Sequence, residues 1–176
     1  HFLLRRQRQM CIRDRLIHLG WNRLQQGLSQ REQWLLPLKQ HAPHGLDAST
    51  ELFPDQEDTN LIETLMSEHN LMPRGFIAIG PSASQPLKCW PLLHFTHLTE
   101  KLIQSGWKIV LVGGPDEPEP ELLEEEFGDK IINLAGRLSP LQTAELLRNA
   151  RYLVANDTSL VHLAEAMGTP SKAIFG

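Results

Sequence analysis

Short apolar runs alternate with amphipathic segments from residue 76 onward. The apolar runs predict strands at residues 76–79, 107–112, 130–134, 151–155 and 171–175. The segments between them place apolar residues at helical spacing and predict helices at residues 91–105, 119–127, 140–149 and 158–167. Strands that are apolar throughout are typical of a sheet covered by helices on both faces. The alternation therefore predicts an α/β fold with a doubly wound parallel sheet and right-handed crossovers.

The residues before this pattern are organised differently. Residues 16–36 carry apolar residues at ragged helical spacing, and residues 37–60 are polar and proline-containing, which predicts a linker. A short helix is predicted at residues 59–70. We therefore divide the chain into an N-terminal helical segment and linker, residues 1–74, and an α/β domain, residues 75–176.

The start of the chain is strongly basic. Its first 31 residues contain seven arginines against a single acidic residue, Asp14. This pattern is compatible with a solvated helix or with a basic amphipathic helix that touches a membrane or RNA. The run Met10-Cys11-Ile12-Arg13-Asp14-Arg15 also resembles translated sequencing adapter, in which case about the first 15 residues have no biological role.

Composition narrows the class of protein. The chain has 176 residues, of which 41% are hydrophobic and 22% charged, and its net charge is −4. This composition is that of a soluble globular protein without a nucleic-acid partner. Two cysteines, Cys11 and Cys89, do not make a disulfide framework and fit a reducing compartment. The sequence shows no zinc-binding pattern of paired Cys or His.

The loop after the first predicted strand has the composition of an anion site. Parallel sheets bind ligands at the carboxyl ends of their strands, so each such loop is a candidate. Here Ser82, Ser84 and Lys88 stand among small residues, which suits a diphosphate. A plain connecting loop with a surface lysine is the alternative. The sequence contains neither G-x-G-x-x-G nor a Walker A loop, which argues against dinucleotide dehydrogenases and P-loop enzymes.

The loop after the fourth predicted strand offers a helix N-terminus. We expect Asp157 to be the N-cap, with the N–H groups of Thr158 and Ser159 directed at a phosphate. His162 lies about one turn further on and shares their face, so it could donate to the same phosphate. The alternative is a capped helix with a surface histidine.

The two remaining loops have weaker signals. Carboxylates after the second strand, including Glu117, suit ribose hydroxyls. The other acidic residues of that helix are interpreted as a solvated face. After the third strand, the segment around Leu138 offers backbone groups and an apolar side chain to a flat base.

Taken together, the loops resemble a known family. The resemblance covers residues 76–176. It rests on four motifs in order: Ser82-Ala83-Ser84 with Lys88 and Trp90-Pro91; Val112-Gly113-Gly114-Pro115; Asn133-Leu134-Ala135-Gly136-Arg137; and Asn156-Asp157-Thr158 with His162-Leu163-Ala164 and Gly168-Thr169-Pro170. They are similar to the C-terminal, nucleotide-sugar-binding half of glycosyltransferase family 9, the lipopolysaccharide heptosyltransferases. The resemblance implies a Rossmann-like domain of the GT-B fold.

The resemblance also implies a reaction. The donor would be ADP-heptose and the acceptor the lipopolysaccharide core, with inversion at the anomeric carbon and without a metal ion or cofactor. Lys88 would offset charge on the leaving ADP. The substrate-binding residues implied are Ser82, Ser84 and Lys88 for the diphosphate, Thr158, Ser159 and His162 for phosphate, Asp157 for the sugar, Glu117 for ribose, and Leu138 for adenine.

Departures from the family pattern affect what we expect of this chain. Ser159 stands where the family usually has glycine, so the approach of phosphate differs there. The catalytic base is expected in an N-terminal acceptor domain that this chain lacks, and the closing segment after Gly176 is also missing. We therefore expect the fragment alone to be inactive.

The whole enzyme would work in the bacterial cytoplasm, with peripheral contact at the inner face of the inner membrane. A GT-B transferase using a UDP-sugar and a non-catalytic nucleotide-binding module are the alternatives.

Overall fold

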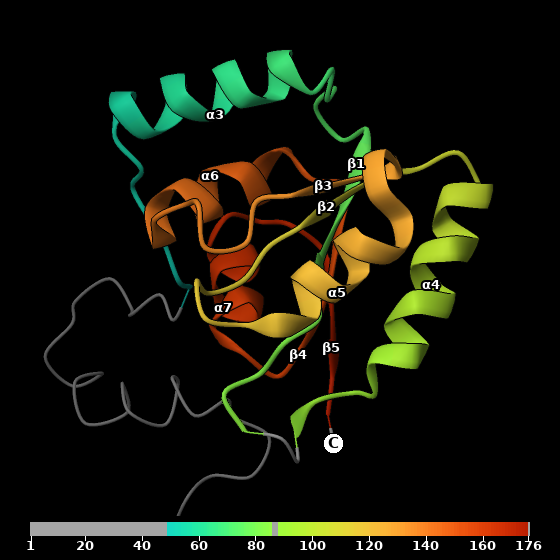
Figure 1. Cartoon of the computed structure of the whole chain (residues 1–176). Helices are drawn as coiled ribbons and strands as arrows, with labels where there is room; N and C mark the ends of the chain where they lie inside the picture. Colours follow the sequence, from blue (N-terminus) through green and yellow to red (C-terminus); the bar gives the residue numbers. More distant parts are fainter. Residues whose placement is uncertain (1–48, 86–87, 176) are drawn as a thin grey trace, which may run out of the picture. The chain divides into compact units, whose positions relative to one another are not determined.

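The structure is a computed structural model that describes residues 49–85 and 88–175 (Figure 1). Ser49–Gly176 form one compact unit. The predictions for residues 1–48, including the helix at 16–36 and the origin of the first residues, lie outside the described residues.

The described residues form a five-stranded parallel sheet with the strand order β3-β2-β1-β4-β5. The strands are β1 (Phe76–Gly80), β2 (Lys108–Leu111), β3 (Ile131–Asn133), β4 (Tyr152–Asn156) and β5 (Ser171–Ile174). The helices are α3 (Gln56–Glu68), α4 (Leu92–Gln104), α5 (Pro118–Phe127), α6 (Pro140–Asn149) and α7 (Ser159–Ala166), with a short 3-10 helix, η3 (Gly128–Lys130). Each strand and helix predicted from residue 59 onward is therefore present, and the predicted parallel α/β fold is confirmed.

Local capping explains where two helices begin. At α3, Asp55 Oδ1 accepts a hydrogen bond from the Asp58 N–H at 2.8 Å, and Asp58 Oδ2 accepts one from the Asp55 N–H at 3.4 Å. This capping box starts α3 at Gln56, earlier than the prediction at residue 59. At α6, Ser139 and Gln142 form a second capping box, and Pro140 occupies the first helical position as predicted.

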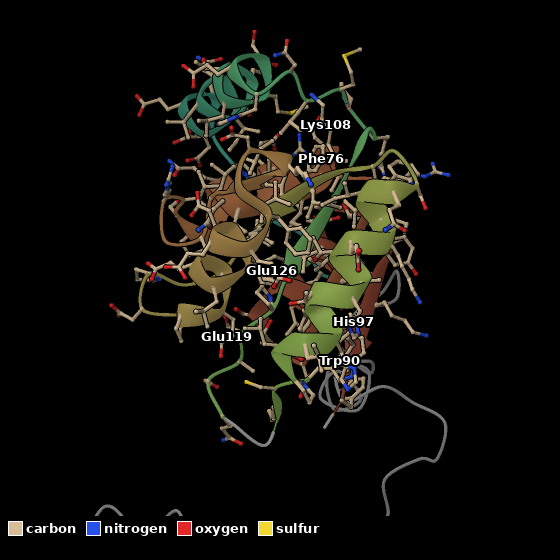
Figure 2. The ribbon with its side chains drawn as sticks, turned by 45° about the vertical axis from the view of Figure 1, so that its right-hand side comes forward. Phe76, Trp90, His97, Lys108, Glu119 and Glu126 are labelled. Atoms are coloured by element: carbon tan, nitrogen blue, oxygen red, sulfur yellow. The ribbon has the colours of Figure 1, made fainter. Side chains whose placement is uncertain are left out.

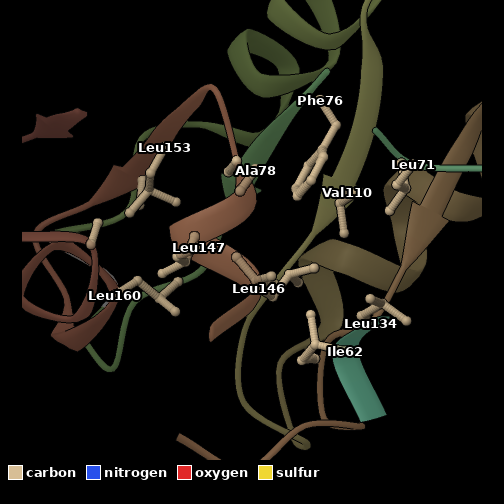
Figure 3. Close-up of a cluster of buried hydrophobic side chains, with 14 of the residues drawn as sticks. Ile62, Leu71, Phe76, Ala78, Val110, Leu134, Leu146, Leu147, Leu153 and Leu160 are labelled. Atoms are coloured by element: carbon tan, nitrogen blue, oxygen red, sulfur yellow. The ribbon is translucent and has the colours of Figure 1, made fainter. Parts of the chain in front are cut away.

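Alternate residues of the strands face two different core clusters. Phe76 and Ala78 of β1 pack in one cluster with residues of α6 and α7 and with Ile62 of α3 (Figure 3). Ile77 and Ile79 pack in the other, which includes Phe95 of α4 and Leu123 of α5. Helices α3, α6 and α7 thus cover one face of the sheet, and α4 and α5 cover the other (Figure 1).

The parallel strands give the sheet two different edges. Phe76 and Lys108 mark the amino edge, where β1 and β2 begin, and Trp90 lies toward the opposite, carboxyl edge (Figure 2). At the amino edge, Lys108 Nζ donates to the backbone oxygens of His69 and Asn70, at 3.1 and 2.6 Å, and ties the turn after α3 to the sheet. Loops that follow the strands therefore gather at the carboxyl edge.

None of the helices in residues 49–85 and 88–175 is long and apolar enough to cross a bilayer.

Candidate functional site

A cavity of about 330 Å³ opens at the carboxyl edge of the sheet. Its walls come from the loops that follow β1, β2, β3 and β4 and from the first turns of α6 and α7. The lining residues are Ser82, Gly113, Gly114, Pro115, Glu117, Gly136, Leu138, Pro140, Thr143, Thr158, Ser159, Leu160 and Leu163. The cavity is within the size range of small-molecule sites.

Two buried hydroxyls line this cavity without a protein partner. Ser82 Oγ and Thr158 Oγ1 are buried and form no hydrogen bond to any group in the described part of the chain. Leaving a buried hydroxyl unpaired costs about 1–3 kcal/mol. Such a cost is typical of a site whose polar groups are completed by a ligand.

The positively charged side chain beside the cavity, Lys88, forms an ion pair within the protein. Lys88 Nζ donates to Asp157 Oδ2 at 2.8 Å, although the two residues lie on loops that follow different strands. Their side chains are 43% and 35% exposed, so solvent screens the ion pair and its contribution to folding is small. The pair places one positive and one negative group at the same edge as the cavity.

Glu117 folds back on its own loop. Its Oε2 accepts a hydrogen bond from the Gly114 N–H at 2.9 Å, and a Cβ at Gly113 would collide with the same oxygen. A carboxylate accepts several hydrogen bonds, so this contact leaves capacity for a ligand hydroxyl.

The loops after β2 and β3 meet at a glycine. Gly136 has φ of +70°, and a Cβ there would lie 2.7 Å from Pro115 Cα. A side chain at this position would strain the backbone and push the two loops apart. The close approach of Gly136 to Pro115 therefore fixes this wall of the cavity.

The predicted site residues divide into three groups. Ser82, Glu117, Leu138, Thr158 and Ser159 line the cavity. Lys88 and Asp157 form their ion pair beside it, and Ser84 is exposed on its loop. His162 is 74% exposed, with Nδ1 at 3.9 Å from Glu165 Oε2, and it is not among the lining residues.

The predicted N-cap of α7 is wrong. The N-cap is Thr158, in extended conformation and without a side-chain capping bond, and the helix begins at Ser159. The Asp157 carboxylate instead pairs with Lys88 through Oδ2. Ser159, the first helical residue, and Leu160 both line the cavity, so the N-terminus of α7 reaches it.

Sequence reasoning missed lining residues on both helices, among them Leu163 and Thr143. Leu163 lies one turn after Ser159 on α7, so the spacing that suggested His162 applies equally to Leu163. Thr143 follows Pro140 by about one turn on α6, and a helix that starts at the carboxyl edge presents its first turn to the cavity. Both could have been found by extending the loop search one turn into each helix.

The described residues contain no group of three or more His, Cys, Asp or Glu side chains placed to hold a metal ion.

The strand order and the cavity define the class of protein. The chain direction from β1 runs outward through β2 and β3 on one side and through β4 and β5 on the other. A ligand cavity at the carboxyl edge of such a sheet is characteristic of Rossmann-like domains. The model of glycosyltransferase family 9 (heptosyltransferase) matches residues 26–176, and the chain belongs to this family.

Curated relatives and solved structures agree with this assignment. The chain is 36% identical over 109 residues to lipooligosaccharide heptosyltransferase 2 of Haemophilus influenzae, covering 58% of this chain and 32% of that protein. It is 32% identical over 109 residues to lipopolysaccharide heptosyltransferase 2 of Escherichia coli, covering 58% of this chain and 31% of the relative. The matched part of the chain thus spans about a third of the length of these curated relatives.

Among solved structures, the E. coli ADP-heptose lps heptosyltransferase II aligns with a TM-score of 0.63 at 27% identity, over 78% of this chain and 42% of that one. E. coli heptosyltransferase WaaC with ADP aligns with a TM-score of 0.51 at 29% identity, over 56% of this chain and 33% of that one. The expected fold class, a Rossmann-like domain of a GT-B glycosyltransferase, is confirmed.

Proposed function

We propose that this chain is the donor-binding part of an inverting, metal-independent heptosyltransferase that uses ADP-heptose in lipopolysaccharide core biosynthesis. The observation that carries the proposal is the pair of buried hydroxyls, Ser82 and Thr158, which face the same cavity without protein partners. A diphosphate supplies the acceptor oxygens that these donors lack. Membership of the family supports the choice of nucleotide, as does the solved structure of the relative WaaC with ADP.

The diphosphate is assigned to the loops after β1 and β4. Thr158 and Ser159 stand at the N-terminus of α7, where the helix dipole favours an anion. Ser82 donates from the loop after β1, and Ser84 and His162 would have to turn inward to join it. Lys88 supplies the positive charge from the edge of the cavity.

The nucleoside is assigned to the loops after β2 and β3. The Glu117 carboxylate accepts from the ribose hydroxyls while it keeps its bond to the Gly114 N–H. Leu138 contacts the adenine ring, on the side of the cavity where Pro115 and Gly136 meet. Asp157 accepts hydrogen bonds from hydroxyl groups of the sugar.

In the proposed reaction, an acceptor hydroxyl attacks the anomeric carbon of the donor from the face opposite the diphosphate. The new bond joins the acceptor oxygen to that carbon, and the bond from the carbon to the phosphate oxygen breaks with its electron pair on ADP. Lys88 stabilises the charge that grows on ADP in the transition state. The base that takes the acceptor proton is assigned to an acceptor domain outside the residues of this chain, so we expect the chain alone not to turn over.

The same proposal includes the chain's partners and organisation. The acceptor is a lipopolysaccharide core held by the acceptor domain, and contact with the inner face of the inner membrane is peripheral. The division into residues 1–74 and a nucleotide-sugar-binding domain at 75–176 belongs to the proposal as a division of function, because α3 shares one core with the sheet.

Calorimetry with ADP tests the proposed function. The 176-residue chain should bind ADP, and Lys88→Ala should weaken binding by about 1–3 kcal/mol, or about 5- to 150-fold in Kd, through loss of a charged hydrogen bond. Lys101→Ala, which removes an exposed lysine of α4, is the matched control and should leave Kd unchanged.

Three other outcomes would decide against parts of the proposal. Equal binding of UDP and ADP would favour a UDP-sugar transferase. ADP binding that requires Mg²⁺ and is lost in EDTA would contradict metal independence. A folded chain that binds no nucleotide would overturn the donor-binding assignment.

A further inference from the structure

We propose that Asn156 is a positioning residue that holds both ends of the loop carrying Ser82 and Lys88. Asn156 is the last residue of β4, and its side chain is completely buried. Its Nδ2 donates to the backbone oxygen of Pro81 at 2.7 Å, and its Oδ1 accepts from the Trp90 N–H at 2.9 Å. Pro81 and Trp90 flank residues 82–89, so a single amide ties the beginning of the loop to its end. The diphosphate that this loop is taken to bind rests on the proposed function.

The two contacts require an asparagine. One partner is a carbonyl, which can only accept, and the other is a backbone N–H, which can only donate. The side chain must therefore present one donor and one acceptor at fixed positions, which the amide of Asn does. An Asp at this position keeps the acceptor for Trp90 but sets a second oxygen against the Pro81 carbonyl.

Among the described residues of this loop, the exposed ones have little packing to hold them, so we expect the loop to depend on these bonds. Ser84 and Gln85 are exposed, and the loop's internal contacts include the Lys88 N–H to Gln85 oxygen bond at 2.9 Å. At its end, Trp90 is anchored by stacking on His94 and by edge contact with Phe95. Asn156 connects that anchor to Pro81, the residue before Ser82 in the cavity wall.

Asn156 and Asp157 act on the loop from neighbouring positions. Asp157 pairs with the Lys88 ammonium, whereas Asn156 holds the backbone on both sides of Lys88. The ion pair is half-exposed and easily exchanged, while the amide bonds are shielded from water. Asn156 therefore keeps the loop in place when Lys88 turns from Asp157 to the diphosphate.

The reactivity of Cys89 tests this role without any ligand. Cys89 Sγ lies within the loop, 3.5 Å from the Ala83 oxygen and 3.6 Å from the Gln85 oxygen, and Cys11→Ser leaves it as the sole thiol of the full chain. In that background, Asn156→Ala should raise the alkylation rate of Cys89 by about tenfold, the ratio expected when loss of the buried bonds favours the open loop. Asn156→Asp should raise the rate as well, because the Trp90 bond remains but a carboxylate oxygen then faces the Pro81 carbonyl.

Thr169→Val is the matched control for these variants. It also removes a buried side-chain bond, from Thr169 Oγ1 to the Leu147 oxygen at 2.7 Å, but at the amino edge of the sheet. It should leave the Cys89 rate unchanged. Equal rates in wild type and in both Asn156 variants, or a rise of the same size in Thr169→Val, would overturn the inference. Should Asn156→Ala fail to fold by circular dichroism, Asn156→Asp decides the question.

A double-mutant cycle on ADP binding separates positioning from general stability. If Asn156 acts through Lys88, Lys88→Ala should raise Kd about 5- to 150-fold in the wild-type chain but only about twofold in the Asn156→Ala chain. Additive effects would contradict a positioning role. If the wild-type chain binds no ADP, the proposed function fails, and the Cys89 rates alone decide whether Asn156 holds the loop.

Discussion

At the scale of single residues, the cavity is marked by groups that the folded chain leaves incomplete. Ser82 and Thr158 bury hydroxyls without protein partners, whereas the buried Thr169 hydroxyl donates to the Leu147 oxygen. Natural proteins pair nearly all buried polar groups, so unpaired ones in the same cavity indicate a ligand site. Their cost to folding can be measured without knowing the ligand.

Replacing the two threonines should have opposite effects on stability. Thr158→Val removes an unpaired buried hydroxyl, so we expect the free energy of unfolding to stay the same or to rise by about 1 kcal/mol. Thr169→Val breaks a buried bond and should lower it by about 1–3 kcal/mol. Urea denaturation measures both, and a Thr158→Val variant as unstable as Thr169→Val would contradict our interpretation of the site.

At the scale of elements, α6 and α7 bring their first turns to the cavity by different means. At α6, Ser139 Oγ accepts from the Gln142 N–H at 3.2 Å, and Gln142 Oε1 accepts from the Ser139 N–H at 2.9 Å. At α7 the N-cap Thr158 makes no such bond. Both first turns reach the cavity, but only the N-terminus of α6 is capped by a side chain of the protein.

Removal of the cap of α6 should destabilise the protein measurably. Ser139→Ala is expected to lower the free energy of unfolding by about 0.5–2 kcal/mol, the usual loss for an N-cap. Ser105→Ala, at the exposed C-cap of α4, is the control and should change it by less than about 0.5 kcal/mol. Thermal or urea unfolding followed by circular dichroism would show the difference, and equal stabilities would argue against the capping box.

The N-terminus of α7 also shows where prediction from sequence ends. Asn156, Asp157, Thr158 and Ser159 are four successive residues that all favour the N-cap position. Local preference cannot choose among them. In the structure the first two have partners far along the chain, since Pro81 and Trp90 engage Asn156, and Lys88 engages Asp157. The position of the helix followed from periodicity, whereas these long-range contacts could not be predicted from it.

The residues of the candidate site, like the N-terminus of α7, could be predicted only in part. Ser82, Glu117, Leu138, Thr158 and Ser159 line the cavity because the order of parallel strands places their loops at one edge. His162 points to solvent, and Leu163, with equivalent spacing, faces the cavity instead. Leu163 belongs to the apolar face of α7, which packs toward the sheet, whereas spacing from Ser159 alone does not distinguish it from His162.

At the scale of the whole molecule, α3 belongs to the same core as the sheet. Ile62 of α3 is completely buried and lies in one cluster with Val110 of β2 and Leu146 of α6 (Figure 3). The backbone of Arg74 also donates to the Asn149 oxygen at 2.7 Å, which links the segment after α3 to the end of α6. These contacts join α3 to the cooperative fold.

Truncation of Ile62 should therefore destabilise the sheet as well as α3. Ile62→Ala is expected to lower the free energy of unfolding by about 2–5 kcal/mol, as for other buried isoleucines. Leu61→Ala, at the neighbouring exposed position, is the control and should cost less than about 1 kcal/mol. Hydrogen exchange measured on peptides from α3 and from β2 reports both segments, and faster exchange in α3 alone would show that it unfolds independently.

The two edges of the parallel sheet have a practical consequence. Every loop that lines the cavity follows a strand, whereas the turns at residues 105–107 and 128–130 precede β2 and β3 at the amino edge. None of those turn residues is among the lining residues. Fluorescent labels, affinity tags or short insertions placed in these turns should leave the cavity intact, so the amino edge is the natural attachment point for immobilising the protein in binding assays.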